Sequence, residues 1–186
     1  MPLDLARAFL DGGARLLQLR AKDLASGPLL DLSDALVALA DDYEAGVIVN
    51  DRVDVARLCG ADGVHVGQED LPPAVARELL GAAAVVGFST HSVAQVEAAL
   101  LEPLSYLAVG PVFGTSTKDT GYSAVGLELV SVAAGLATMP IVAIGGVTLA
   151  NAAAAIGAGA SAVAVISDLL VGDPAERVKA YLRILE

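Results

Sequence analysis

The chain has 186 residues, a length that suits one domain with a sizeable buried core. Its formal net charge of −11 would repel a polyanion, which excludes general nucleic-acid binding. Hydrophobic residues make up 55% of the sequence but occur in short runs, none near the roughly 20 residues that span a bilayer. With a single cysteine and no signal-peptide pattern at Met1–Arg7, we expect a cytoplasmic protein with no membrane partner, and the sequence leaves a homo-oligomer open.

One pattern recurs along the chain: a helical stretch ends at glycine, a short apolar run follows, and a polar or glycine-rich turn comes next. Runs this short, apolar at nearly every position, are typical of strands buried on both faces of a parallel sheet. In chain order they lie within residues 13–20, 46–51, 63–67, 85–89, 106–110, 140–146 and 162–167.

Segments with helical spacing lie between these runs. The first shares a face formed by Leu5, Ala6, Phe9 and Leu10, and others cover residues 28–43, 92–101, 127–136 and 174–185. Strict alternation of strand and helix predicts right-handed crossovers and one parallel sheet.

The number of strands indicates the fold class. Seven are too many for a small flavodoxin-like sheet and one fewer than an eight-stranded barrel has. The helix containing Leu5 and Phe9 has only Met1 and Pro2 ahead of it, whereas every other predicted helix follows a strand. We therefore predict one α/β domain over residues 1–186, a (β/α)8 TIM-type barrel that lacks its first strand. A doubly wound open sheet is the alternative.

Polar residues follow the predicted strands, and that end of a β/α barrel carries the active site. Strand alternation places Gln18 and Arg20 on the face toward the barrel mouth, with Lys22 shortly after them. Two cations and an amide can hold a phosphate or pyrophosphate. The alternative is a solvated strand end.

Two acids follow the next two strands. Asp51 comes after Asn50, and Asp70 follows the segment Gly67-Gln68-Glu69. Carboxylates at neighbouring strand ends suit Mg²⁺, which takes one or two of them together with water and substrate phosphate oxygens. Each acid could instead cap the helix that follows it.

Two later segments have features of phosphate sites. The loop over residues 110–121 is long, rich in hydroxyl groups and carries one cation, Lys118, which indicates a lid that donates to phosphate; a plain flexible loop is the alternative. Gly145-Gly146 and Ser167 follow the last two strands, where barrels often build a phosphate cup. His65 lies within a strand and is expected to be a core histidine; His91 is ambiguous.

Taken in order, these motifs resemble the thiamine phosphate synthase family. The resemblance is carried by Gln18–Lys22, Asn50–Asp54, Gly60–Asp70, Gly87–His91, Val109–Phe113 leading to Thr115, Thr117 and Lys118, then Ile144–Gly146 and Val165–Ser167. It covers nearly the whole chain. Two departures are the absent first strand and Gly114, which stands where proline is common.

The resemblance implies a transferase that joins 4-amino-2-methyl-5-hydroxymethylpyrimidine pyrophosphate to a thiazole phosphate and releases pyrophosphate. It implies Mg²⁺ on Asp51 and Asp70, and catalytic roles for Arg20, Ser89 and Lys118. The residues implied to bind the pyrimidine pyrophosphate are Gln18, Arg20, Lys22, Asn50, Ser89 and Lys118; those implied to bind the thiazole phosphate are Thr115, Thr117, Gly146, Ile166 and Ser167. Rival functions are a thiazole tautomerase and a non-catalytic phosphate-binding relative.

Overall fold

A computed structural model describes residues 2–114 and 123–185 of the chain. In the described part, seven parallel strands follow one another in chain order, each paired with its neighbours in sequence, as the sequence predicts. They are β1 (Leu16–Leu19), β2 (Gly46–Asn50), β3 (Gly63–Val66), β4 (Val85–Thr90), β5 (Tyr106–Val109), β6 (Ile141–Ile144) and β7 (Ala162–Ala164). A doubly wound sheet would reverse this order at a switch point, so the observed order is that of a barrel.

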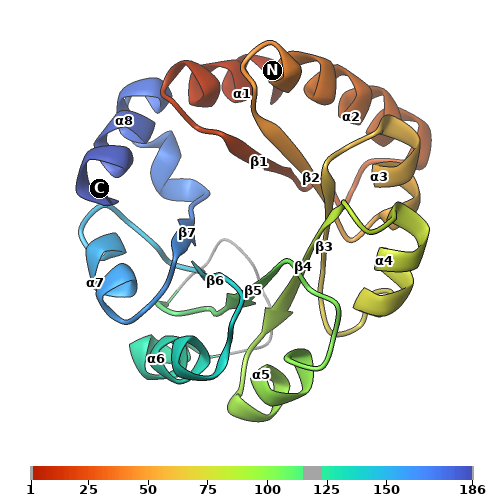
Figure 1. The fold of residues 1–186 in the computed structure, drawn as a ribbon. Coiled ribbons are helices and arrows are strands. Elements are labelled where there is room, and N and C mark those ends of the chain that lie inside the picture. The colour runs from red at the N-terminus through yellow and green to blue at the C-terminus, as the bar shows by residue number, and fades with distance from the viewer. Residues whose placement is uncertain (1, 115–122, 186) are drawn as a thin grey trace.

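Helices surround the curved sheet and form the outer ring of the molecule (Figure 1). They are α1 (Pro2–Asp11), α2 (Ser26–Asp41), α3 (Val53–Cys59), α4 (Pro73–Leu80), α5 (Val93–Ala99), α6 (Gly126–Leu136), α7 (Ala152–Gly157), the 3₁₀ helix η1 (Ser167–Leu170) and α8 (Pro174–Leu185). Within the described residues, no helix is long and apolar enough to cross a membrane.

Apolar side chains between the sheet and the helices form the core. Leu17 and Leu19 on β1 pack against a cluster that includes Leu10 of α1 and Leu36 of α2, as strand alternation predicts. Strand β3 is buried along its whole length. This outer packing holds the strand ends, and so the loops that follow them, in fixed positions.

The sheet is open between its two edges. In the described residues β1 pairs with β2 and β7 pairs with β6, and no ladder joins β1 to β7. Residues on the inner face of these strands, among them Leu16, Ala162 and Ala164, are exposed. The inner face of the barrel is therefore accessible along this seam.

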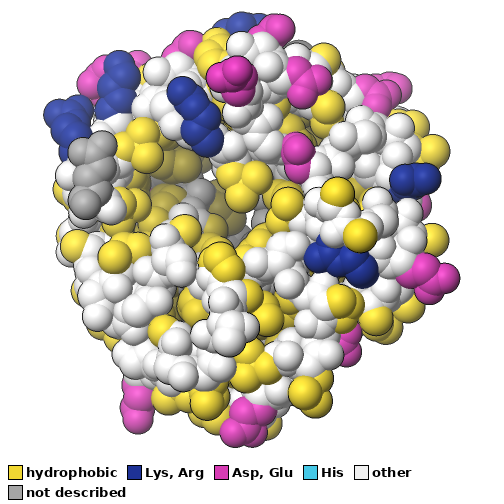
Figure 2. Space-filling view, viewed as in Figure 1, with side chains coloured by type: hydrophobic (Ala, Val, Ile, Leu, Met, Phe, Trp, Pro, Cys, Tyr) yellow, Lys and Arg dark blue, Asp and Glu magenta, His cyan; other side chains and the backbone are white. Residues whose placement is uncertain are grey.

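Outside the seam, α1 and α8 lie side by side (Figure 1). A Cβ atom at Gly12 would come within 2.6 Å of the Ala175 carbonyl oxygen and 2.7 Å of Val178 Cβ, so glycine is needed for this close approach. Figure 2 shows a hollow in the middle of the ring, bordered largely by hydrophobic side chains, with most charged side chains farther out. The helical ring thus closes where the sheet does not.

Candidate active site

Three charged side chains gather at the carboxyl ends of β1, β2 and β3. Lys22 Nζ lies 3.3 Å from Asp51 Oδ2. Asp70 accepts the backbone N–H of Gly67 at 2.8 Å. The pKa of Asp70 is raised, first by burial and further by a hydrogen bond to Asp51 and by the charge of that acid, against the opposing effects of Gly67 and Lys22. The structure thus brings Lys22 and both acids together.

The backbone at Asp51 has an unusual conformation. Its φ is +64°, in the left-handed region that non-glycine residues seldom adopt. The Arg52 N–H donates to the Asn50 carbonyl across this turn at 2.8 Å, and the Asp51 N–H donates to the His65 carbonyl of β3 at 2.8 Å. Backbone strain of this kind is often found at functional sites.

Neither acid occupies a helix cap. Arg52 is the N-cap residue of α3, and Pro72 is the N-cap residue of α4. The alternative in which Asp51 and Asp70 serve as N-caps is therefore wrong for both residues.

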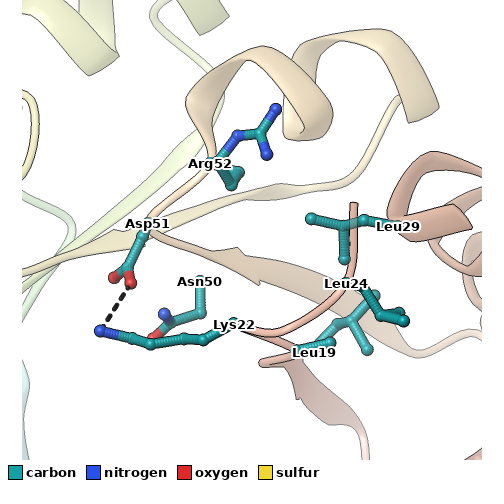
Figure 3. A pocket seen from close by; sticks show the side chains of 8 residues that line it. Leu19, Lys22, Leu24, Leu29, Asn50, Asp51 and Arg52 are labelled. Carbon is teal, nitrogen blue, oxygen red and sulfur yellow. Dashed lines mark ion pairs between the residues drawn. The ribbon is translucent and has the colours of Figure 1, made fainter. Parts of the chain in front are cut away.

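A pocket of about 220 Å³ opens between the ends of β1 and β2. Figure 3 shows Lys22 reaching toward Asp51 on one side and Leu19, Leu24 and Leu29 on the other. The Arg52 guanidinium points away from the pair and binds Asp54 and Ser26 instead. The full lining comprises Leu19, Ala21, Lys22, Leu24, Leu29, Asn50, Asp51 and Arg52. The pocket therefore has a charged side and an apolar side.

A hydrogen-bonded chain of side chains crosses the middle strands. His65 Nδ1 lies 2.8 Å from the Tyr106 hydroxyl and His65 Nε2 lies 2.7 Å from Ser89 Oγ. Tyr106 also interacts with Gln18, while burial raises the pKa of its hydroxyl. His65 is buried with both ring nitrogens engaged, so it is a core histidine as predicted, but one that positions Ser89.

Tyr106 escaped the sequence analysis. It opens an otherwise aliphatic strand and stands in register with Gly87, where a Cβ atom would come within 2.0 Å of the Tyr106 ring. One sequence feature could have indicated a role for Tyr106. It is a lone tyrosine at the start of an apolar run, and the preceding strand contains a glycine.

The predicted phosphate cup lies after β6 and β7. Gly145 and Gly146 both have positive φ, +84° and +67°. A Cβ atom at Gly146 would come within 2.6 Å of the Gly114 carbonyl oxygen, so the chain needs glycine there. Ile166 and Ser167 are exposed directly after β7.

The other residues singled out in the sequence lie in different surroundings. Gln18 and Arg20 are exposed at the open edge, and Asn50 is buried beside Asp51. His91 Nδ1 hydrogen-bonds the Gly110 carbonyl. Thr115, Thr117 and Lys118 lie outside the described residues.

Comparison with known proteins agrees with the order of the motifs. The family model described as thiamine monophosphate synthase matches residues 2–169. A thiamine-phosphate synthase from Chlorobium limicola is 42% identical over 186 residues, covering 100% of this chain and 89% of the relative. One from a Roseiflexus species is 43% identical over 171 residues, covering 92% and 72%.

A solved structure shows the same fold. The thiamine phosphate pyrophosphorylase from Pyrococcus furiosus superposes with a TM-score of 0.92 at 31% identity, covering 100% of this chain and 89% of that one. The family resemblance read from the sequence is confirmed, and the chain belongs to the thiamine monophosphate synthase family.

Proposed function

We propose that the chain is a transferase that joins 4-amino-2-methyl-5-hydroxymethylpyrimidine pyrophosphate to thiazole phosphate, giving thiamine phosphate and pyrophosphate. The observation that carries this proposal is the gathering of Lys22, Asp51 and Asp70 beside the pocket between β1 and β2. A departing pyrophosphate needs its growing negative charge neutralised, and cations supplied at that point lower the barrier. The names of the relatives support the synthase over a tautomerase or a non-catalytic protein.

The donor set at these strand ends fits Mg²⁺. In the part of the chain that the structure describes, no group of three or more His, Cys, Asp or Glu residues could hold a metal. Two carboxylates close enough for Asp51 to raise the pKa of Asp70 suit an ion whose other ligands are water and substrate phosphate. Bound there, Mg²⁺ would neutralise pyrophosphate charge.

The other residues take roles by position. Arg20, Ser89 and Lys118 act on the leaving pyrophosphate, and His65 holds the Ser89 hydroxyl in place. The pyrimidine pyrophosphate contacts Gln18, Arg20, Lys22, Asn50, Ser89 and Lys118; the thiazole phosphate contacts Thr115, Thr117, Gly146, Ile166 and Ser167.

We also propose that the barrel has room for an eighth strand between β1 and β7, which is the first strand of the complete barrel and is absent from this chain. Three observations support this: the facing edges of β1 and β7 are unpaired within the described part of the chain, the inner residues Leu16 and Ala162 are exposed, and Figure 2 shows a hollow.

The test is an assay of the purified protein with both substrates and MgCl₂, scored for thiamine phosphate and pyrophosphate. We expect both products in equal amounts, and neither after the metal is removed with EDTA. If thiazole phosphate binds but no product forms, the chain is a non-catalytic relative. Isomerisation of a thiazole substrate without pyrophosphate release would show a tautomerase. Either result would overturn the proposal.

A further inference from the structure

An acid stands directly after Ser167, at a place where a phosphate is proposed to bind. Its carboxylate, Asp168 on η1, is mostly buried, with 11% of the side chain exposed. A negative charge so close to a phosphate site would normally weaken anion binding. The contacts of Asp168 explain why it is there.

Asp168 joins three segments of the chain. Its Oδ2 accepts the backbone N–H of Leu149, in the loop between β6 and α7, at 3.1 Å. Arg177 of α8 binds both carboxylate oxygens, with Nη2 2.8 Å from Oδ1 and 2.9 Å from Oδ2, and Nε 3.2 Å from Oδ2. The hydroxyl of Tyr181, also on α8, donates to Oδ2.

The loop that Asp168 holds is the one that carries the glycine pair. Within it, Asn151 donates from Nδ2 to the Gly146 carbonyl at 3.0 Å and accepts the Thr148 N–H at 2.7 Å. The loop is therefore braced internally, and the hydrogen bond from the Leu149 N–H to Asp168 joins it to η1. This link joins the loop that carries Gly146 to the helix that begins at Ser167.

We propose that Asp168 and Arg177 are positioning residues for the thiazole-phosphate cup. The pair holds the Gly145–Val147 turn against the start of η1, so that the backbone at Gly146 and Ser167 meets one phosphate group. Neither side chain needs to touch the substrate. This inference rests on the proposed function for the identity of its ligand.

Because Asp168 and Arg177 carry opposite charges, we expect their removal to weaken thiazole-phosphate binding to different extents. Burial tends to raise the pKa of Asp168, but the hydrogen bonds from Arg177, Tyr181 and Leu149 outweigh it and the pKa is lowered, so the acid is ionised at neutral pH. Loss of Arg177 leaves this carboxylate without its cationic partner beside the bound phosphate. Loss of the Asp168 charge weakens the link between the loop and α8, but it also removes the repulsion between Asp168 and the phosphate.

The experiment measures binding of thiazole phosphate alone by calorimetry, followed by KM for each substrate. We expect Arg177→Gln to weaken thiazole-phosphate binding by about tenfold or more, and Asp168→Asn by a smaller factor. The double variant should bind about as well as Asp168→Asn. Arg177→Lys, which keeps the charge, should recover part of the loss. KM for the pyrimidine pyrophosphate should stay within about twofold.

The matched control is Lys179→Gln, which removes an exposed ion pair with Glu176 on the same helix and should leave both substrates unaffected. Equal losses for the two substrates, additive losses in the double variant, or a lower melting temperature with unchanged thiazole-phosphate binding would each overturn the inference. So would a wild-type protein that does not bind thiazole phosphate. A wild-type protein that binds it without forming thiamine phosphate would refute the proposed function alone.

Discussion

Asp51 and Asp70 follow different strands, β2 and β3, and the backbone at Asp51 is strained. Asp51 has a left-handed φ, and its carboxylate pairs with Lys22. Burial is the main cause of the raised pKa of Asp70, and a hydrogen bond to Asp51 and repulsion by the charge of that acid raise it further. A cation placed between them would relieve that repulsion.

Removal of Asp70 tests the metal site. We expect Asp70→Ala to lower Mg²⁺-dependent turnover by about 10²–10³ or more, because a preorganised electrostatic contact to developing charge is lost. Glu69→Ala, which removes the adjacent exposed acid, is the control. The measurement is turnover across a Mg²⁺ titration, together with the melting temperature of each variant. Full activity in Asp70→Ala would mean that this acid holds no metal.

Lys118 is a second test at this scale. It is the only lysine among residues 110–121, and Lys118→Ala should lower turnover by about 10²–10³ while leaving the melting temperature nearly unchanged. Lys179→Ala, on α8, provides a control for the loss of one positive charge. A fall in melting temperature with normal turnover would show that the lysine supports the fold instead.

The sequence predicted a phosphate site that includes Lys22 and a metal site at Asp51 and Asp70. The structure brings the three residues together because the carboxyl ends of neighbouring parallel strands meet at one edge. The sequence did not predict Tyr106 or Asp168. Tyr106 meets His65 only through the pairing of β3, β4 and β5, and Asp168 meets Leu149 and Arg177 through packing between separate loops and helices. Contacts between segments that are far apart in the chain leave no pattern in the local sequence that could predict them.

At the level of elements, short apolar runs were sufficient to locate all seven strands. Their ends were harder to place. The last run was predicted within residues 162–167, but β7 ends at Ala164, because its ladder follows β6 only as far as Ile144. Beyond that point Gly145 takes a positive φ and β6 offers no further partner. Pairing, more than the composition of the run, sets where a strand stops.

Strand β4 offers a prediction about close packing. In Gly87→Ala the new methyl group would meet the Tyr106 ring, so the ring must move away from His65 and Gln18. We expect a loss of about 1–3 kcal/mol in the free energy of unfolding. Turnover should fall as well, because Ser89 loses the support of His65.

The control for this change is Gly135→Ala in α6, where nothing lies within 4 Å of the added Cβ atom. There alanine should stabilise the helix by about 0.5–1 kcal/mol. Denaturant unfolding of both variants gives the comparison. Equal stability of Gly87→Ala and the wild type would mean that the Tyr106 ring shifts at no cost.

For the whole molecule, the open seam predicts a gain from an added strand. A longer chain that supplies a strand between β1 and β7 would pair both edges and cover Leu16, Ala162 and Ala164. We expect a higher melting temperature and a higher midpoint of denaturant unfolding, with less binding of a hydrophobic dye. The control carries a proline in the middle of the added strand, which removes ladder hydrogen bonds. If both longer chains match the present one in stability, no strand belongs in the seam.

The contact between α1 and α8 has a mechanical consequence. Among the residues that the structure describes, each strand of the sheet pairs only with its neighbours in the chain. The close approach at Gly12 is where the first helix meets the last. A force applied to the two ends therefore loads this helix contact before any strand. Once it parts, β1 and β7 are edges held by one ladder each, and strands can detach singly in a series of small extensions. In a closed barrel, the first strand to leave must break two ladders at once.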